Sequence, residues 1–226
     1  MTFNHLDILM QIVVFLFAIS VHESAHAWMA NRCGDPTARM LGRITLNPIK
    51  HIDPIGTVLL PLLAAVTHLP VFGWAKPTPV DPNNFRNPVR DDILTSVVGP
   101  VSNFAIAAGA VLLMLGISWT SELGRIIVQS VANGYVVDTS SVLMPMVLLL
   151  YNAMLINVLL GVFNLIPVPP LDGSHVLRHL LPEDARRIYD MAGVFALVLL
   201  LFAGSRFVWA LVSPVIAFLK AILTSV

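Results

Sequence analysis

The sequence is poor in charge. Only 12% of its 226 residues are Asp, Glu, Lys or Arg, whereas 57% are hydrophobic and the mean hydropathy is +0.82. Because a soluble domain carries roughly 25% charged residues, this composition excludes an ordinary soluble domain and predicts a polytopic membrane protein. The 13 basic residues balance the 13 acidic ones, so the net charge gives no indication of a nucleic-acid partner.

Cysteine is nearly absent, with Cys33 as the single example. One cysteine excludes an intramolecular disulfide and a thiolate metal cluster, so we interpret Cys33 as a small buried hydrophobe. The N-terminus also lacks a basic segment ahead of its apolar run, which argues against a cleavable signal peptide. That apolar run leads directly into a histidine motif.

Long uncharged runs predict the membrane helices, each of which needs about 20 apolar residues. The segment 55–69 contains Pro61 and is too short to cross, so we expect it to be re-entrant or interfacial. The expected fold is an all-α polytopic membrane protein, a single domain over residues 1–226 with about five spanning helices. The predicted spans are 6–31, 93–118, 143–167, 186–204 and 207–225; the alternative for the last two is one long tilted span.

The positions of Lys and Arg predict the orientation in the membrane, since cytoplasmic loops carry an excess of both. Residues 1–31 contain neither, and residues 32–92 contain seven of them. The loop 119–142 contains one, and the loop 168–190 contains three. If 55–69 does not cross, the basic loops all lie inside, and the expected location is the cell (inner) membrane with residues 32–92 in the cytosol.

The first predicted span contains the motif His22-Glu23-Ser24-Ala25-His26. Residues four apart share a helix face, so both imidazoles can bind one metal ion. Glu23 lies beside them and can take a proton from a metal-bound water. Charged groups inside a membrane cost on the order of 3 kcal/mol each, so such groups are kept for function. The alternative, surface histidines on a soluble helix, disagrees with the apolar surroundings.

Asp172 is the strongest candidate for a third ligand, because catalytic zinc usually has three protein ligands and a water. It follows Pro167, Pro169 and Pro170, which unwind the end of the preceding helix and can direct a side chain inward. The alternative role for Asp172 is an ordinary helix N-cap. His175 is a rival ligand, and it lies four residues before His179. Their segment looks like a solvated cytosolic helix, however, and has no glutamate between the two histidines.

Residues 72–80 contain Gly73 and Trp74, followed by prolines at alternate positions. Proline has no backbone N–H, so this segment is an edge strand at most, and residues 42–46 are its possible partner. We therefore expect a small β-hairpin near the active site, with Gly73 and Trp74 as substrate-binding candidates, because edge strands bind extended peptides. The alternative is a plain connecting loop.

Two asparagines in apolar sequence are the other substrate-binding candidates. Asn103 follows Gly99 and Pro100 within the second predicted span, where it needs a polar partner. That partner is either another helix, through an interhelical hydrogen bond, or the substrate. Asn164 lies close to the unwound stretch before Asp172 and can help to order it.

Together, these motifs resemble the site-2 protease family of intramembrane zinc metalloproteases. The resemblance rests on the His-Glu-x-x-His helix, on Gly-Pro-x-x-Asn at 99–103 and on Asn-x-x-Pro with Leu-Asp-Gly over 164–173. It implies that His22, His26 and Asp172 bind one Zn²⁺, that Glu23 is the catalytic base, and that the substrates are transmembrane proteins in the lipid bilayer.

The stretches that begin at Gly42 and Phe72 are similar to the compact bacterial branch of that family. The loop 119–142 is too short for the PDZ domain of many relatives, and we expect no CBS domains before the end at Val226. Two other functions were considered. A non-proteolytic metal-binding or metal-transport protein has no use for Glu23 as a base, and a desaturase-like enzyme needs more histidine ligands than this chain supplies.

Overall fold

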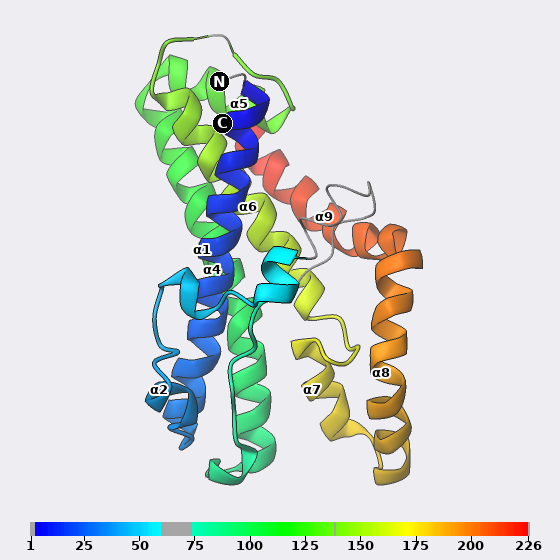
Figure 1. Cartoon of the computed structure of the whole chain (residues 1–226). Coiled ribbons are helices and arrows are strands. Elements are labelled where there is room, and N and C mark those ends of the chain that lie inside the picture. The colour runs from blue at the N-terminus through cyan, green and yellow to red at the C-terminus, as the bar shows by residue number, and fades with distance from the viewer. Residues whose placement is uncertain (1–2, 60–73, 138, 226) are drawn as a thin grey trace. The chain divides into compact units, whose positions relative to one another are not determined.

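The computed structural model describes residues 3–59, 74–137 and 139–225 (Figure 1). Nearly all of this part is helical or forms short connections between helices. The longer helices are α1 (Phe3–Cys33), α4 (Pro88–Thr120), α5 (Glu122–Ala132), α6 (Leu143–Asn164), α7 (Asp172–Leu180), α8 (Glu183–Ala203) and α9 (Ser205–Thr224). Four short helical segments complete the set: α2 (Thr37–Met40), η1 (Pro48–Lys50), η2 (Pro54–Leu59) and η3 (Pro82–Asn84).

Four helices in the described residues are long and apolar enough to cross a membrane, rather than the five expected. They are Asp7–Cys33, Pro88–Thr120, Leu143–Asn164 and Arg206–Thr224. Helix α8 is not among them, and its first eight residues include five charged ones. Of the predicted re-entrant segment 55–69, only residues 55–59 are described, and they belong to the π-helical segment η2.

The predicted β-hairpin is wrong, since no strand occurs in the part of the chain that the structure describes. Residues 74–80 run without regular secondary structure, and their N–H groups bond elsewhere. The Lys76 N–H donates to the His51 carbonyl at 2.9 Å, and the Thr78 N–H donates to the Glu23 carboxylate. Pro77 has no N–H, so a regular ladder of hydrogen bonds cannot form here.

The chain divides into two compact units. The first consists of residues 1–18, 103–163 and 206–226, and its core forms where α4, α5, α6 and α9 pack together. Two buried asparagines meet in this core, where the Asn103 side chain donates to Asn157 Oδ1 at 2.8 Å. The four largest fully buried side chains there are Met114, Ile127, Met154 and Leu223.

The second unit consists of residues 19–102 and 164–205 and contains the histidine motif. Its polar anchor is Asp35, two residues after the end of α1, and the Asp35 side chain is fully buried. The carboxylate accepts bonds from the N–H and hydroxyl of Thr37, from the Asp81 N–H at 2.8 Å and from the Asn84 amide at 3.0 Å. Asp35 therefore joins the end of α1 to the segment that precedes α4.

Burial disfavours the charged form of Asp35, but these hydrogen bonds, led by that of the Thr37 hydroxyl, lower its pKa below the usual 3.8. A carboxyl with a lowered folded-state pKa contributes stability above its unfolded pKa. That contribution to stability is lost as the pH falls through the pKa that Asp35 has in the folded state.

We predict that Asp35→Ala lowers the free energy of unfolding by about 3 kcal/mol, because it leaves several buried donors without an acceptor. The measurement is denaturant unfolding of the detergent-solubilised chain at neutral pH. Asp184→Ala removes the same charge from an exposed position and should change the free energy by less than about 0.5 kcal/mol. Equal effects of the two substitutions would contradict the anchoring role of Asp35.

Candidate metal centre

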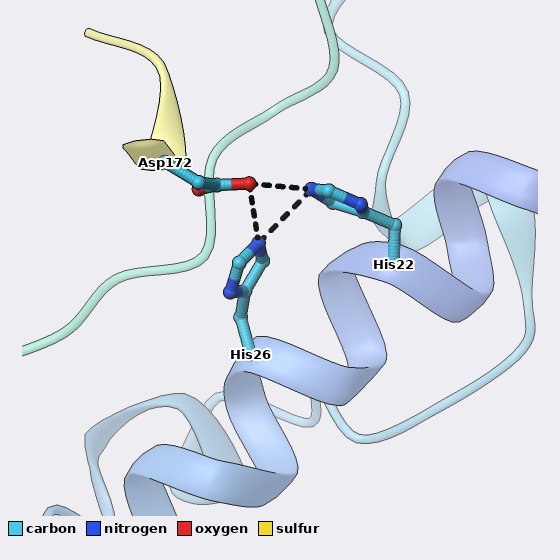
Figure 2. A group of neighbouring side chains, drawn as sticks. All are labelled: His22, His26 and Asp172. Atoms are coloured by element: carbon cyan, nitrogen blue, oxygen red, sulfur yellow. Dashed lines mark hydrogen bonds and ion pairs between the residues drawn. The ribbon is translucent and has the colours of Figure 1, made fainter. Parts of the chain in front are cut away.

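His22 and His26 lie one turn apart on α1, as their spacing predicts, and each residue is only 7% exposed (Figure 2). Their Nε2 atoms are 3.0 Å apart, and their rings meet edge to face at 80°. Two imidazole nitrogens at this distance need a proton or a cation between them. The pair is therefore arranged to bind a shared positive charge.

Asp172 completes a triangle with the two histidines. Its Oδ2 lies 3.1 Å from His22 Nε2 and 3.4 Å from His26 Nε2. Asp172 is the first residue of α7, after the irregular stretch 165–171 that the prolines predicted. The N-cap of α7 is Leu171, so Asp172 does not have the ordinary capping role that was its alternative. The two imidazoles outweigh the effect of burial and hold the pKa of the Asp172 carboxyl well below its usual range.

The three atoms fit a tetrahedral zinc ion. Zinc bonds of 2.0–2.2 Å at tetrahedral angles separate ligand atoms by about 3.4 Å, close to the observed spacing of 3.0–3.4 Å. Asp172 Oδ2 is buried, and both imidazole nitrogens lie within 3.4 Å of it, as suits a metal ligand. These three residues are also the one group of possible metal ligands found among the described residues.

Helix α4 fixes the tautomer of His26. The His26 Nδ1 lies 2.6 Å from the Thr95 carbonyl oxygen, which can only accept a hydrogen bond. Nδ1 therefore carries the proton, and in the neutral ring Nε2 presents its lone pair to the triangle. Gly99, one turn further along α4, permits this close approach, because a Cβ there would overlap the imidazoles of both His26 and His22.

The Glu23 side chain contacts Thr78, in the segment before α4. Its Oε2 accepts hydrogen bonds from the Thr78 N–H at 2.9 Å and from the Thr78 hydroxyl at 2.8 Å. The same hydroxyl lies 3.0 Å from the Glu23 carbonyl. These hydrogen bonds keep the Glu23 carboxylate in a fixed orientation.

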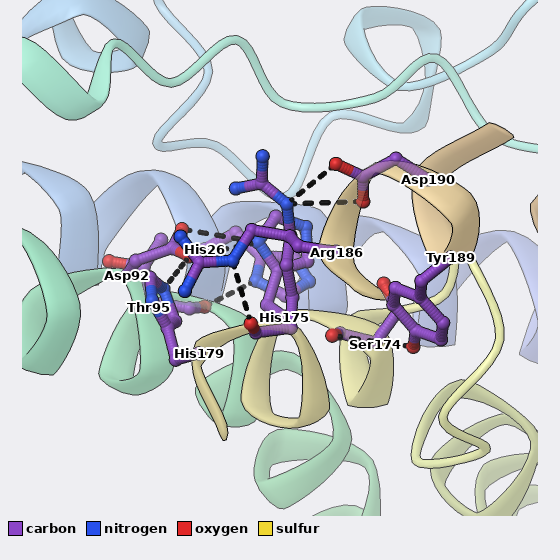
Figure 3. Close-up of polar contacts among 10 residues, drawn as sticks. His26, Asp92, Thr95, Ser174, His175, His179, Arg186, Tyr189 and Asp190 are labelled. Carbon is purple, nitrogen blue, oxygen red and sulfur yellow. Dashed lines mark hydrogen bonds and ion pairs between the residues drawn. The ribbon is translucent and has the colours of Figure 1, made fainter. Parts of the chain in front are cut away.

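The rival ligand His175 lies on α7 and is not part of the group formed by His22, His26 and Asp172. His175 and His179 both contact the carboxylate of Asp92 on α4 (Figure 3). The hydrogen bond to Asp92 raises the pKa of His175 above its ordinary value, although burial lowers it. Sequence analysis missed Asp92, whose only signal was a charge immediately before the uncharged run 93–118.

Three of the four predicted substrate-binding residues are among the described residues. Trp74 is 52% exposed, and its carbonyl accepts a bond from the Thr57 hydroxyl at 2.7 Å. Gly73 lies outside the described residues. Asn164 is the last residue of α6. Asn103 belongs to the other unit, where its bond to Asn157 is the interhelical contact considered as its alternative role.

Comparison with known proteins adds a second line of evidence. The family model of peptidase family M50 matches residues 10–203. A relative from Bacillus subtilis, named "Putative zinc metalloprotease YwhC", is 34% identical over 208 residues, which cover 89% of this chain and 85% of the relative.

Two mycobacterial relatives are described in the same words under the name Rip2. The one from Mycobacterium tuberculosis is 31% identical, over 85% of this chain and 65% of its own length. The one from Mycolicibacterium smegmatis is 27% identical, over 77% of this chain and 58% of its own length. No solved structure shows a significant match to the chain. The matches confirm the resemblance that the motifs indicated, and the chain belongs to peptidase family M50, the site-2 protease family of intramembrane zinc metalloproteases.

Proposed function

We propose that this protein hydrolyses peptide bonds within or near transmembrane segments of other membrane proteins, with one zinc ion held by His22, His26 and Asp172. The convergence of three buried donor atoms from α1 and α7 carries this proposal. Three protein ligands leave a fourth tetrahedral position for water, as in catalytic rather than structural zinc sites. Bound zinc would lower the pKa of that water and polarise the scissile carbonyl.

Glu23 is the proposed general base. It neighbours His22 in sequence but is not one of the converging donors, so its carboxylate is available to take a proton from water and pass it to the leaving amine. The Thr78 N–H and hydroxyl hold Glu23 Oε2, which fixes the orientation of the carboxylate. Because helical backbone is satisfied internally, a substrate helix has to unwind before its carbonyl reaches the site. Trp74, Gly73, Asn103 and Asn164 remain proposed contacts for the unwound segment.

We predict that Glu23→Gln reduces cleavage of a model transmembrane substrate by at least about 100-fold, while zinc stays near one per chain. Asp172→Ala should instead lose the zinc itself. The measurements are cleavage in reconstituted vesicles and metal analysis of the same preparations. Glu122→Gln, at an exposed position on α5, is the matched control and should retain both properties. Wild-type cleavage by Glu23→Gln would refute the base assignment, whereas zinc loss would make Glu23 part of the metal scaffold.

We predict that Gly99→Ala weakens zinc binding by about tenfold or more, because the added methyl group displaces the two imidazoles. Gly109→Ala is the control on the same helix, since a Cβ there meets nothing within 4 Å. Chelator competition measures the zinc affinity of both variants. Equal affinities would show that the ligands tolerate a side chain at Gly99, and the close approach of α4 would then have no role in metal binding.

We propose further that the active site opens toward the cytosol from a cell (inner) membrane. The support is the excess of Lys and Arg in residues 32–92 compared with the loop 119–142. Helix α4, a candidate span, separates Asn83 from Thr120, and both residues are exposed.

We predict that in a Cys33→Ser background Asn83→Cys reacts with a membrane-impermeant thiol reagent only from the cytosolic side. Thr120→Cys should react only from outside. Labelling is measured on intact cells and on inverted vesicles, and each variant serves as the control for the other. Reaction of Asn83→Cys in intact cells would reverse the proposed orientation.

A further inference from the structure

Asp92 contacts both histidines of helix α7. The His175 Nδ1–H donates to its carboxylate, 3.1 Å from Oδ2 and 3.2 Å from Oδ1, and the His179 Nε2–H donates to Oδ2 at 2.7 Å (Figure 3). The Asp92 and His179 side chains are only 13% and 14% exposed. The i, i+4 spacing of the histidines thus presents two donors from one face of α7 to a single acceptor on α4.

These contacts are hydrogen bonds and not a second metal site. A metal site would bring both imidazole nitrogens and the carboxylate close to one point. No such group besides His22, His26 and Asp172 occurs among the described residues. The two histidines therefore act on Asp92 directly.

The same turn of α4 also contacts His26, a histidine of the metal centre. Thr95 lies three residues after Asp92, and its carbonyl accepts the hydrogen bond from His26 Nδ1. One short stretch of α4 thus holds a metal ligand of α1 and, through His175 and His179, the helix that begins with Asp172.

Helix α7 depends on such contacts for its position. It has nine residues, and a helix of that length is not stable alone in water. Irregular chain precedes it over 165–171. Helix α8 contacts it near both ends: Arg186 donates to the carbonyls of Arg178 and Leu181, and the Tyr189 hydroxyl lies 3.5 Å from the Ser174 carbonyl. Asp92 supplies the hydrogen bonds that join α7 to α4.

We propose that Asp92 is a positioning residue for the metal ligand Asp172, which it holds at bonding distance from His22 and His26 by anchoring α7 to α4. This inference rests on the proposed function only in taking these three residues as the zinc ligands. Outer groups that orient metal ligands typically change metal affinity 10- to 100-fold when they are removed.

We predict that Asp92→Asn weakens zinc binding about tenfold and alters the visible absorption spectrum of the cobalt-substituted protein, which reports ligand geometry. The full chain is used in detergent, and the zinc dissociation constant is measured by chelator competition. Asp91→Asn is the matched control. It removes the same charge from the adjacent residue, and the Asp91 carboxylate accepts from the Asn87 N–H rather than from α7. Its zinc affinity and cobalt spectrum should match those of the wild type.

His179→Gln tests the same contact from the other side and guards against a folding defect at Asp92. Because both substitutions break one interaction, the double variant should bind zinc no more weakly than the weaker single variant. The proposal would be overturned if Asp92→Asn bound zinc within twofold of Asp91→Asn and left the cobalt spectrum unchanged. It would also be overturned if the affinity losses of Asp92→Asn and His179→Gln added fully in the double variant. Failure of the ligand assignment itself would give a different result, because the His22→Ala variant would then keep its zinc.

Discussion

The close approach of α4 to the histidine motif is the constraint on which the metal centre depends. Two imidazoles and a carboxylate are withdrawn from water within 3.4 Å of one another, so each needs a second partner to fix its orientation. The first turns of α4 supply such a partner to His26, through the carbonyl of Thr95, and Gly99 provides the space. The Asp92 carboxylate contacts the helix that begins with Asp172. A bulky residue at Gly99 would remove the space, and a shift of α4 would remove the partners.

The three residues of the candidate metal centre could be found from the sequence, because each has a strong signal within its own segment. His22 and His26 share a helix face by spacing alone, and three prolines mark the unwound approach to Asp172. The partners of these ligands could not be predicted in the same way. Any residue has a carbonyl such as that of Thr95, and the contacts of Asp92 with His179 and of Thr78 with Glu23 arise only through tertiary packing.

The errors of fold prediction have related physical causes. Alternating prolines in residues 74–80 were interpreted as one edge of a hairpin, but the N–H groups of Lys76 and Thr78 bond to a loop carbonyl and a side chain. Helix α8 was predicted to span the membrane from its apolar second half, but the five charged residues at its start keep it out of the candidate spans. The interhelical alternative for Asn103 lacked a named partner, because a single sequence cannot pair it with the equally buried Asn157 that its amide meets.

The bond between Thr78 and Glu23 limits what can lie along the neighbouring backbone. Pro77 and Pro79 have no N–H, and the Thr78 N–H is donated to Glu23. Residues 77–79 therefore offer an approaching chain carbonyl oxygens and no hydrogen-bond donors. An extended peptide that lies against them has to bring its own N–H groups, and a proline in such a peptide would cancel one of the few bonds available. Any peptide lying along this stretch would thus be distinguished by its backbone, before any side chain is considered.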